Sequence, residues 1–244
     1  MTETWLFLGD SLTQGVGSKR ISYASQLQSL LDDRSANTRV VNLAAEATTV
    51  KQDLHLLDEI QAVNPEYIFI MRGALEGIVR PQLQIDGDYP AWFPKSWRRY
   101  AGLDPRCYWS DTWWRRWKDQ RIDWIKQHLR MHLLRTSPNA QLLDDAVFEA
   151  SLVVLLSKLC ELDAHLYLLG LPSVSETTFP GSSEAFLSRN QLIKQCAQDT
   201  GAIYLELDEG MYFDRHYYRD GFHPNQAGAE LMAASLLRQL GFVT

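Results

Sequence analysis

Two short polar segments near opposite ends of the chain carry residues suited to nucleophilic catalysis. The first reads Gly9-Asp10-Ser11-Leu12-Thr13 and directly follows an apolar run, so a tight turn can present the Ser11 hydroxyl and its backbone N–H on the same side. The second places Asp220 three residues before His223, a spacing that can hold a carboxylate against an imidazole and fix its tautomer. Each segment by itself is also typical of a helix cap or a surface polar pair. Ser11 is therefore a candidate nucleophile, His223 its candidate base, and Asp220 the candidate partner of that base.

Other histidines and acids compete for these roles. His216 has no aspartate three residues before it, so His223 is the preferred base. Asp10 or Asp214 offers an alternative carboxylate for orienting a histidine. Three more histidines lie in helix or strand-start patterns that favour structural roles: His128, His132 and His165.

The cysteines indicate neither a metal site nor a disulfide framework. They are three in number, widely spaced, and in no CxxC or Cys/His pattern. We expect buried structural thiols at all three positions (Cys107, Cys160 and Cys196), with no metal ion and no cofactor.

Alternating apolar and helical segments predict the elements that position these residues. Apolar runs at 4–8, 39–43, 67–71, 165–170 and 202–206 are typical of parallel strands covered on both faces. Helical periodicity lies between them at 23–31, 50–62, 142–162, 184–199 and 226–240. This order predicts a single three-layer α/β domain over residues 1–244, with a five-stranded parallel sheet and the site at the carboxyl ends of its strands.

A long insertion, at about residues 78–138, follows the third strand and exceeds the usual connection length. Between Tyr89 and Arg135, eleven Lys and Arg oppose four Asp, a charge of +7; the whole chain carries −6, so the remainder carries −13. Its pattern is helical over 111–134. It holds seven of the eight tryptophans: Trp92, Trp97, Trp109, Trp113, Trp114, Trp117 and Trp124.

Taken together, the GDSLT segment and the DGFHPN segment before the last helix resemble the GDSL, or SGNH, hydrolase family. The resemblance covers the chain outside the insertion and implies a flavodoxin-like fold. It implies Ser11 as nucleophile, His223 as base and Asp220 as its partner. It also implies an activity on esters, within a family that includes esterases, lipases, thioesterases and carbohydrate esterases.

Two family motifs differ in this sequence. Where the family has a glycine whose N–H joins the oxyanion hole beside that of Ser11, the chain has Ala47, or with less support Ala45. An alanine keeps the N–H but adopts positive φ only at a cost. Where the family has an asparagine donor, the chain has Leu75, which cannot donate. Arg72 is a candidate replacement donor, and a salt bridge from Arg72 to Glu76 or Glu46 is an equal alternative.

The insertion has three interpretations. Trp113, Trp117 and Trp124, at spacings of four and seven, fit the core of a helical cap on the site. In the second interpretation the insertion is a substrate lid, whose exposed indoles stack on sugar rings or acyl chains. Four cations of the lid would bind an anionic group of the substrate: Arg98, Arg99, Arg115 and Arg116. We expect Asp10, Trp113 and Arg115 to contact the substrate. Peripheral membrane attachment is the weakest interpretation because the whole chain is negatively charged.

These observations predict a serine hydrolase that cleaves a carboxylic ester through an acyl-serine. An acyltransferase with the same three residues and a silent binding protein of the same fold are the alternatives. We expect a small-molecule or glycan ester as substrate, with no nucleic acid, because no nucleic-acid motif is present. The chain shows no signal-peptide pattern and no run of eighteen apolar residues, so we expect a cytoplasmic protein without stable membrane insertion.

Overall fold

The sheet of the protein has five parallel strands, as the apolar runs predicted. The computed structural model describes residues 2–34, 36–99, 101–108, 111–207 and 216–242. Across the sheet the order is β2 (Thr38–Asn42), β1 (Glu3–Gly9), β3 (Tyr67–Met71), β6 (His165–Leu169) and β7 (Ile203–Leu205). The central strands are covered on both faces, which explains their continuous apolar sequence: the residues of β1 from Trp5 to Leu8 are at most 1% exposed.

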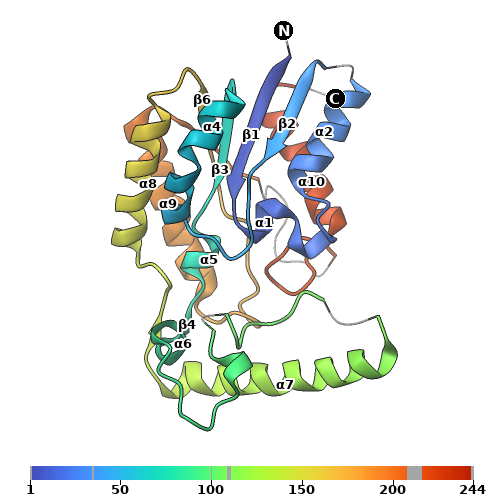
Figure 1. The fold of residues 1–244 in the computed structure, drawn as a ribbon, viewed down its shortest axis with the longest axis vertical. Helices are drawn as coiled ribbons and strands as arrows, with labels where there is room; N and C mark the ends of the chain where they lie inside the picture. The colour runs from blue at the N-terminus through green and yellow to red at the C-terminus, as the bar shows by residue number, and fades with distance from the viewer. Residues whose placement is uncertain (1, 35, 100, 109–110, 208–215, 243–244) are drawn as a thin grey trace.

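Helices cover both faces of this sheet (Figure 1). On one side α2 (Tyr23–Asp33) packs against α10 (Gln226–Gln239), and on the other α8 (Asp145–Leu159) packs against α9 (Ser182–Thr200). The expected helix over 50–62 is instead broken into α3 (Val50–Asp53), a 3₁₀ turn (Leu54–Leu56) and α4 (Leu57–Val63). The break follows Asp53, whose carboxylate turns inward to bind Arg72. Within the ranges given above, no helix combines the length and apolar character needed to cross a membrane.

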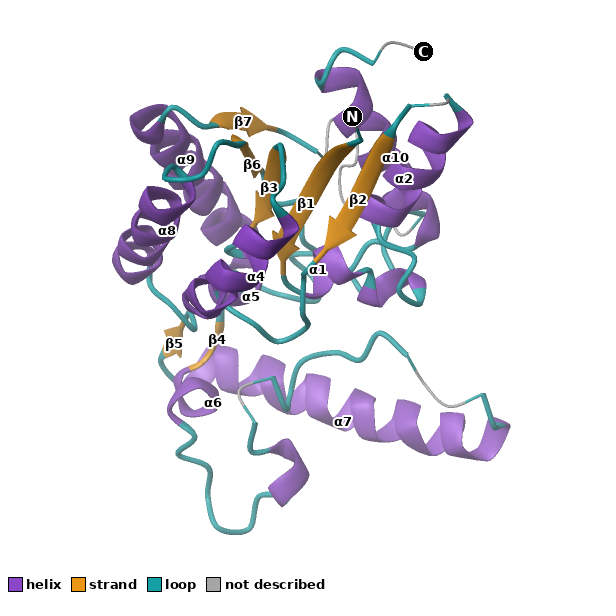
Figure 2. Ribbon diagram, turned by 45° about the horizontal axis from the view of Figure 1, so that its top comes forward, coloured by secondary structure: helices purple, strands orange, loops and turns teal. Residues whose placement is uncertain are grey.

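The insertion leaves the sheet after the short helix α5 (Ala74–Gly77) and returns just before α8. Its two ends meet where β4 (Arg80–Pro81) pairs antiparallel with β5 (Asn139–Ala140). Between them lie α6 (Gln82–Asp86), a 3₁₀ turn (Lys95–Trp97) and α7 (Trp113–Thr136), which begins and ends two residues later than expected. Figures 1 and 2 show α7 running across the carboxyl end of the sheet, below the body of the protein.

A buried ionic cluster fastens α7 to the start of the insertion. The Asp104 carboxylate lies 2.8 Å from Arg80 of β4 and 3.6 Å from Arg130 of α7, and both arginines are 1% exposed. Gln84 donates a further hydrogen bond to Asp104 at 3.0 Å. Burial alone would raise the pKa of Asp104, but the two guanidinium groups outweigh it and hold that pKa below its ordinary range. Asp104 is therefore the anion that holds the insertion together.

The cluster gives a stability prediction. The Asp104→Asn variant leaves two buried guanidinium groups without a counter-charge, and we expect its free energy of unfolding to fall by about 3 kcal/mol in denaturant titration. Because the folded-state pKa of Asp104 is lowered, this contribution is present above the unfolded value and is lost as the pH falls through the folded value. The difference between wild type and variant should thus shrink below about pH 4.

Asp111 provides the matched control, because its side chain is fully exposed just before α7. Asp111→Asn should unfold at the wild-type denaturant concentration. Equal stability of Asp104→Asn and wild type at neutral pH would contradict the role given to Asp104.

Candidate active site

Ser11 lies at the turn from β1 into the short helix α1 (Ser11–Gln14), which is followed by a 3₁₀ turn (Val16–Ser18). Asp10 caps this helix, its carboxylate accepting from the Leu12 N–H at 2.9 Å. Gly9 is required just before it, because a Cβ there would lie 2.1 Å from Oγ1 of Thr13. The end of β1 thus presents the Ser11 side chain at the carboxyl edge of the sheet.

Asp220 and His223 lie in one tight turn before α10. One oxygen of the Asp220 carboxylate accepts from the backbone N–H groups of Phe222 at 3.0 Å and His223 at 2.8 Å. Between them Gly221 has a φ of 92°, in the left-handed region that glycine tolerates. The second oxygen is thereby directed at the imidazole.

The fold brings the three candidate residues into one hydrogen-bonded row. Nε2 of His223 lies 2.9 Å from Oγ of Ser11, and Nδ1 of His223 lies 2.8 Å from Oδ2 of Asp220. In this geometry Nδ1–H donates to the carboxylate, leaving Nε2 to accept the proton of the serine hydroxyl. Burial alone would raise the pKa of Asp220, but hydrogen bonds and charge from His223 outweigh it, so the pKa is lowered and the carboxylate stays ionised. The row has the arrangement needed to activate an oxygen nucleophile.

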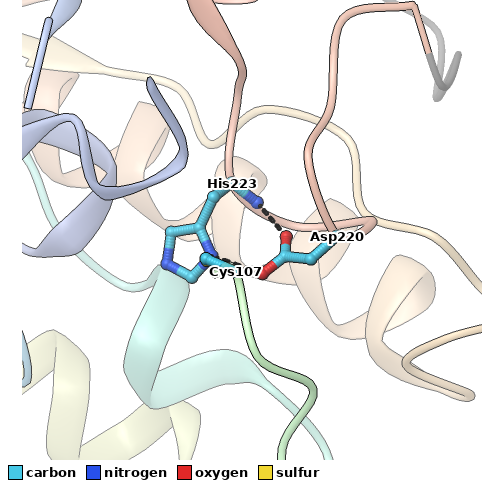
Figure 3. Close-up of side chains that lie close together, drawn as sticks. All are labelled: Cys107, Asp220 and His223. Atoms are coloured by element: carbon cyan, nitrogen blue, oxygen red, sulfur yellow. Dashed lines mark hydrogen bonds and ion pairs between the residues drawn. The ribbon is translucent and has the colours of Figure 1, made fainter. Parts of the chain in front are cut away.

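Cys107, from the insertion, also contacts this row, which the sequence did not indicate. Its Sγ lies 2.7 Å from Oδ2 of Asp220 and 2.8 Å from Nδ1 of His223 (Figure 3). Burial, followed by the Asp220 charge, raises the pKa of the Cys107 thiol, so the neutral thiol donates to the carboxylate. Cys107 is thus a neighbour of the site, whereas of the other two cysteines Cys196 is buried and Cys160, contrary to expectation, is exposed.

The donor atoms of Cys107, Asp220 and His223 lie within 4.8 Å of one another, which raises the question of a metal ion. Two ligands of a tetrahedral zinc ion are roughly 3.4 Å apart, given metal–ligand bonds of about 2.0–2.3 Å. The contacts of 2.7 and 2.8 Å from Sγ are shorter than that. The cluster therefore has the spacing of direct hydrogen bonds.

Ala47 occupies the position proposed for the oxyanion glycine. It lines the same cavity as Ser11 and His223. The alternative residue, Ala45, is not among the described residues that line this cavity, and its N–H donates to the carbonyl of Gly9 at 3.2 Å. The φ of Ala47 is 61°, so the backbone has the left-handed conformation that a glycine would adopt without strain. The loop holds this conformation against a cost of about 1–2 kcal/mol.

Arg72, suggested as a replacement oxyanion donor, supports that loop from behind. Its guanidinium forms a bidentate pair with Asp53, with Nε 2.7 Å from Oδ2, and its Nη1 donates to the carbonyl of Thr48 at 2.9 Å. Arg72 is 2% exposed and is not among the described residues that line the cavity. The suggestion was wrong because these partners engage the guanidinium, and the salt-bridge partner is Asp53 rather than Glu76 or Glu46.

Asp10 is placed inside the fold rather than against a substrate. Its carboxylate is fully buried and accepts from the backbone N–H groups of Leu12 and, at 3.2 Å, Leu75. It therefore joins the loops after β1 and β3, and the expectation of a substrate contact was wrong. Leu75 itself lines the cavity with an apolar side chain.

The two other expected substrate contacts lie on the insertion helix. Trp113 is 79% exposed, and Arg115 is exposed beside it. Neither is among the described residues lining the cavity beside Ser11. His216, the competing base, is likewise exposed and away from this cavity, while Asp214 and Trp109 lie outside the described residues.

The cavity beside Ser11 has a volume of about 180 Å³. Its walls are largely apolar and come from the nucleophile turn, the loops after β2 and β3, the His223 turn and the insertion: Ala47, Leu75, Ile78, Ala101, Pro105, Phe179 and Phe222. The Arg80–Asp104 pair also reaches this wall. A small apolar group attached at Ser11 would be enclosed here.

The positive φ of Ala47 yields a prediction for Ala47→Gly. Removing the Cβ relieves the strain and should raise the free energy of unfolding by about 1 kcal/mol, or the melting temperature by about 2–4 °C, with the oxyanion N–H retained. Ala45→Gly is the control, because the φ of Ala45 is not positive. Glycine at that position relieves no strain and adds entropy to the unfolded chain, so the control should lower the free energy of unfolding. A destabilised Ala47→Gly would show that the loop is not strained at this position.

Comparison with known proteins agrees with this fold. Residues 7–231 match the GDSL-like lipase/acylhydrolase family. No curated protein sequence matches the chain. Among solved structures, Axe2, an acetylxylan esterase from Geobacillus stearothermophilus, shares 19% identity at a TM-score of 0.61, over 99% of this chain and 95% of its own.

Two further structures share the fold. LAE5, an alpha/beta hydrolase enzyme from the metagenome of Lake Arreo in Spain, has 15% identity and a TM-score of 0.65, over 99% of this chain and 96% of its own. TesA has 18% identity and a TM-score of 0.62, over 98% of both chains. With the family match spanning almost the whole sequence, the chain belongs to the GDSL-like lipase/acylhydrolase family and is an ester-hydrolysing enzyme.

Proposed function

We propose that this protein hydrolyses short-chain carboxylic esters through an acyl-serine intermediate on Ser11. The observation that carries the proposal is the row from Ser11 through His223 to Asp220, with contacts of 2.9 and 2.8 Å, at the wall of the small apolar cavity. A helix cap or a surface polar pair would not require Ser11 and His223, which are 212 residues apart in sequence, to be hydrogen-bonded to each other.

In the proposed reaction, Oγ of Ser11 attacks the ester carbonyl as Nε2 of His223 takes its proton. The tetrahedral intermediate collapses, the bond to the alcohol oxygen breaks, and His223 returns the proton to the leaving alcohol. Water then attacks the acyl-serine by the same route, releasing the acid and restoring the hydroxyl of Ser11. The N–H groups of Ser11 and Ala47 are the proposed oxyanion donors.

The size of the cavity supports a short acyl group. A volume of about 180 Å³ holds roughly six groups the size of a water molecule, at about 30 Å³ each. An acetyl or butyryl group fits within this space beside the ester atoms, whereas an octanoyl chain would fill it and leave no room for the ester atoms. Axe2 is an acetylxylan esterase, so acetylated sugars are a reasonable first class of natural ester to test.

Hydrolysis of p-nitrophenyl acetate, butyrate and octanoate tests the proposal. We expect turnover of the two short esters and little of octanoate. Ser11→Ala should abolish this turnover. Asp220→Asn should lower kcat by about 10³–10⁴-fold, because the carboxylate no longer holds the imidazole of His223 in the tautomer that accepts the serine proton. A folded wild type that hydrolyses none of these esters, or that is unaffected by Ser11→Ala, would refute the proposal.

Leu75 allows a test by gain of activity. Its side chain lines the cavity where family members have an asparagine donor. Since one oxyanion donor is typically worth about 10²–10³ in kcat, Leu75→Asn should raise kcat for the acetate ester by about tenfold or more. Leu75→Ala removes the same side chain without adding a donor and should give no increase. A loss of activity in a folded Leu75→Asn protein would show that another group already stabilises the oxyanion.

A further inference from the structure

The insertion helix α7 buries charged residues and exposes large apolar ones. Beside apolar residues such as Leu134, the face toward the protein carries three buried charged residues: Asp123 is 2% exposed, Lys126 6% and Arg130 1%. Residues facing away are large and apolar, with Trp113 79% exposed, Trp117 59% and Trp124 57%. A helix that faces water on one side normally shows the opposite pattern.

The exposed face is continuous along the helix. Trp113, Trp117 and Trp124 are separated by four and seven residues, so they lie in one row, and Trp114 and Ile125 flank that row at 50% and 49% exposure. These are not core residues, contrary to the interpretation of a packed helical cap. We call these five residues the tryptophan face.

Positive charge surrounds the tryptophan face. The exposed cations of α7 are Arg115, Arg116, Lys118, Arg121 and Arg135, and two stack on the indoles, Arg115 on Trp114 and Arg121 on Trp117. The two acids of the helix are turned away, because Asp123 is buried and Asp119 is half-buried near Arg106 at 3.6 Å. Asp111, just before the helix, lies 3.8 Å from Arg116. The face therefore combines apolar bulk with a net positive charge.

We propose that the tryptophan face of α7 docks onto the surface of a membrane that contains anionic lipids. Indole rings partition to the boundary between headgroups and acyl chains, and arginine and lysine beside them bind lipid phosphates and carboxylates. The rest of the chain, at −13, would be repelled by such a surface, so the protein would bind with α7 toward the lipid. Figures 1 and 2 show α7 beyond the carboxyl end of the sheet, where the loop after α6 also extends past the C-terminal half of this helix.

Charge and shape argue against two other occupants. A symmetric dimer through this face would bring two positively charged surfaces against each other. Single-stranded nucleic acid is usually held in a basic groove with stacking platforms, whereas a single helix face is convex and Ile125 offers no ring for stacking. The lipid surface accommodates both the convex shape and the charge.

Vesicle co-sedimentation tests the proposal without reference to catalysis, so its result is independent of the esterase assay. We expect the wild type to bind vesicles of phosphatidylcholine with phosphatidylglycerol at low salt, with a blue shift of tryptophan emission, and to bind pure phosphatidylcholine at least about tenfold less. The triple variant Trp113→Ser/Trp117→Ser/Trp124→Ser should lose this binding. Trp92→Ser is its control, because Trp92 is 75% exposed but lies outside α7.

Two charge-reversal variants distinguish docking through α7 from electrostatic attraction of the whole protein to the vesicle. Lys118→Glu/Arg121→Glu should weaken vesicle binding by about tenfold or more, and Arg39→Glu/Lys51→Glu, with the same change of charge on the sheet side, should not. All these positions are exposed, so the melting temperature serves as the check on folding. Wild type that stays in the supernatant with both vesicles, or a triple variant that binds as well as wild type, would overturn the proposal. A dimer in light scattering that the triple variant abolishes, or preferential binding of single-stranded RNA, would assign the face to another partner and overturn it as well.

Discussion

One hydrogen bond, between the Ser11 hydroxyl and Nε2 of His223, joins two segments that are 212 residues apart in sequence, and the site exists only where the fold makes that contact. Ser11 is placed by β1, whose end is aligned with that of β3 through the pairing of Gly9 with Met71. His223 is placed by a turn whose Asp220 carboxylate fixes both the backbone and the imidazole. Errors of about 1 Å in either placement would break the bond, so the rigidity of the sheet edge is a catalytic requirement.

Buried charged groups supply much of that rigidity. The Asp10 carboxylate links the loops after β1 and β3, and Arg72 links Asp53 to the loop that holds Ala47. Burial is also the main reason why the pKa values of Asp53 and Glu76 are raised. Such groups cost desolvation energy unless each is paired. Here Asp10, Glu76 and Arg72 form hydrogen bonds to loop backbone, and Asp53 is paired with Arg72. The strained φ of Ala47 is maintained by this scaffold.

The sheet could be predicted from sequence for physical reasons, and so could the Asp220–His223 pair from its spacing. The contact of His223 with Ser11, 212 residues away, was instead expected from the resemblance of the two motifs to a known family. Parallel strands buried on both faces are apolar throughout, so their positions can be read from the sequence. The geometry of a short turn at a strand end or before a helix is determined by neighbouring residues, so it too leaves a local sequence pattern. Cys107 could not be predicted, because its contact with Asp220 spans 113 residues and depends on how the insertion folds back. The partner of Arg72 was missed because it required the break in the helix at Asp53. The orientation of α7 was missed because spacing alone does not tell which face is buried, and here Asp104 draws Arg130 inward.

A fluorophosphonate probe, with peptide mapping by mass spectrometry, measures whether Ser11 is a nucleophile activated by His223. The probe forms a covalent bond only with an activated hydroxyl, so it reports on the site without any assumption about the natural ester. We expect a single labelled residue, Ser11, and loss of that label in a folded His223→Ala variant. Folded wild-type protein that remains unlabelled, or labelling of Ser11 that persists without His223, would contradict it.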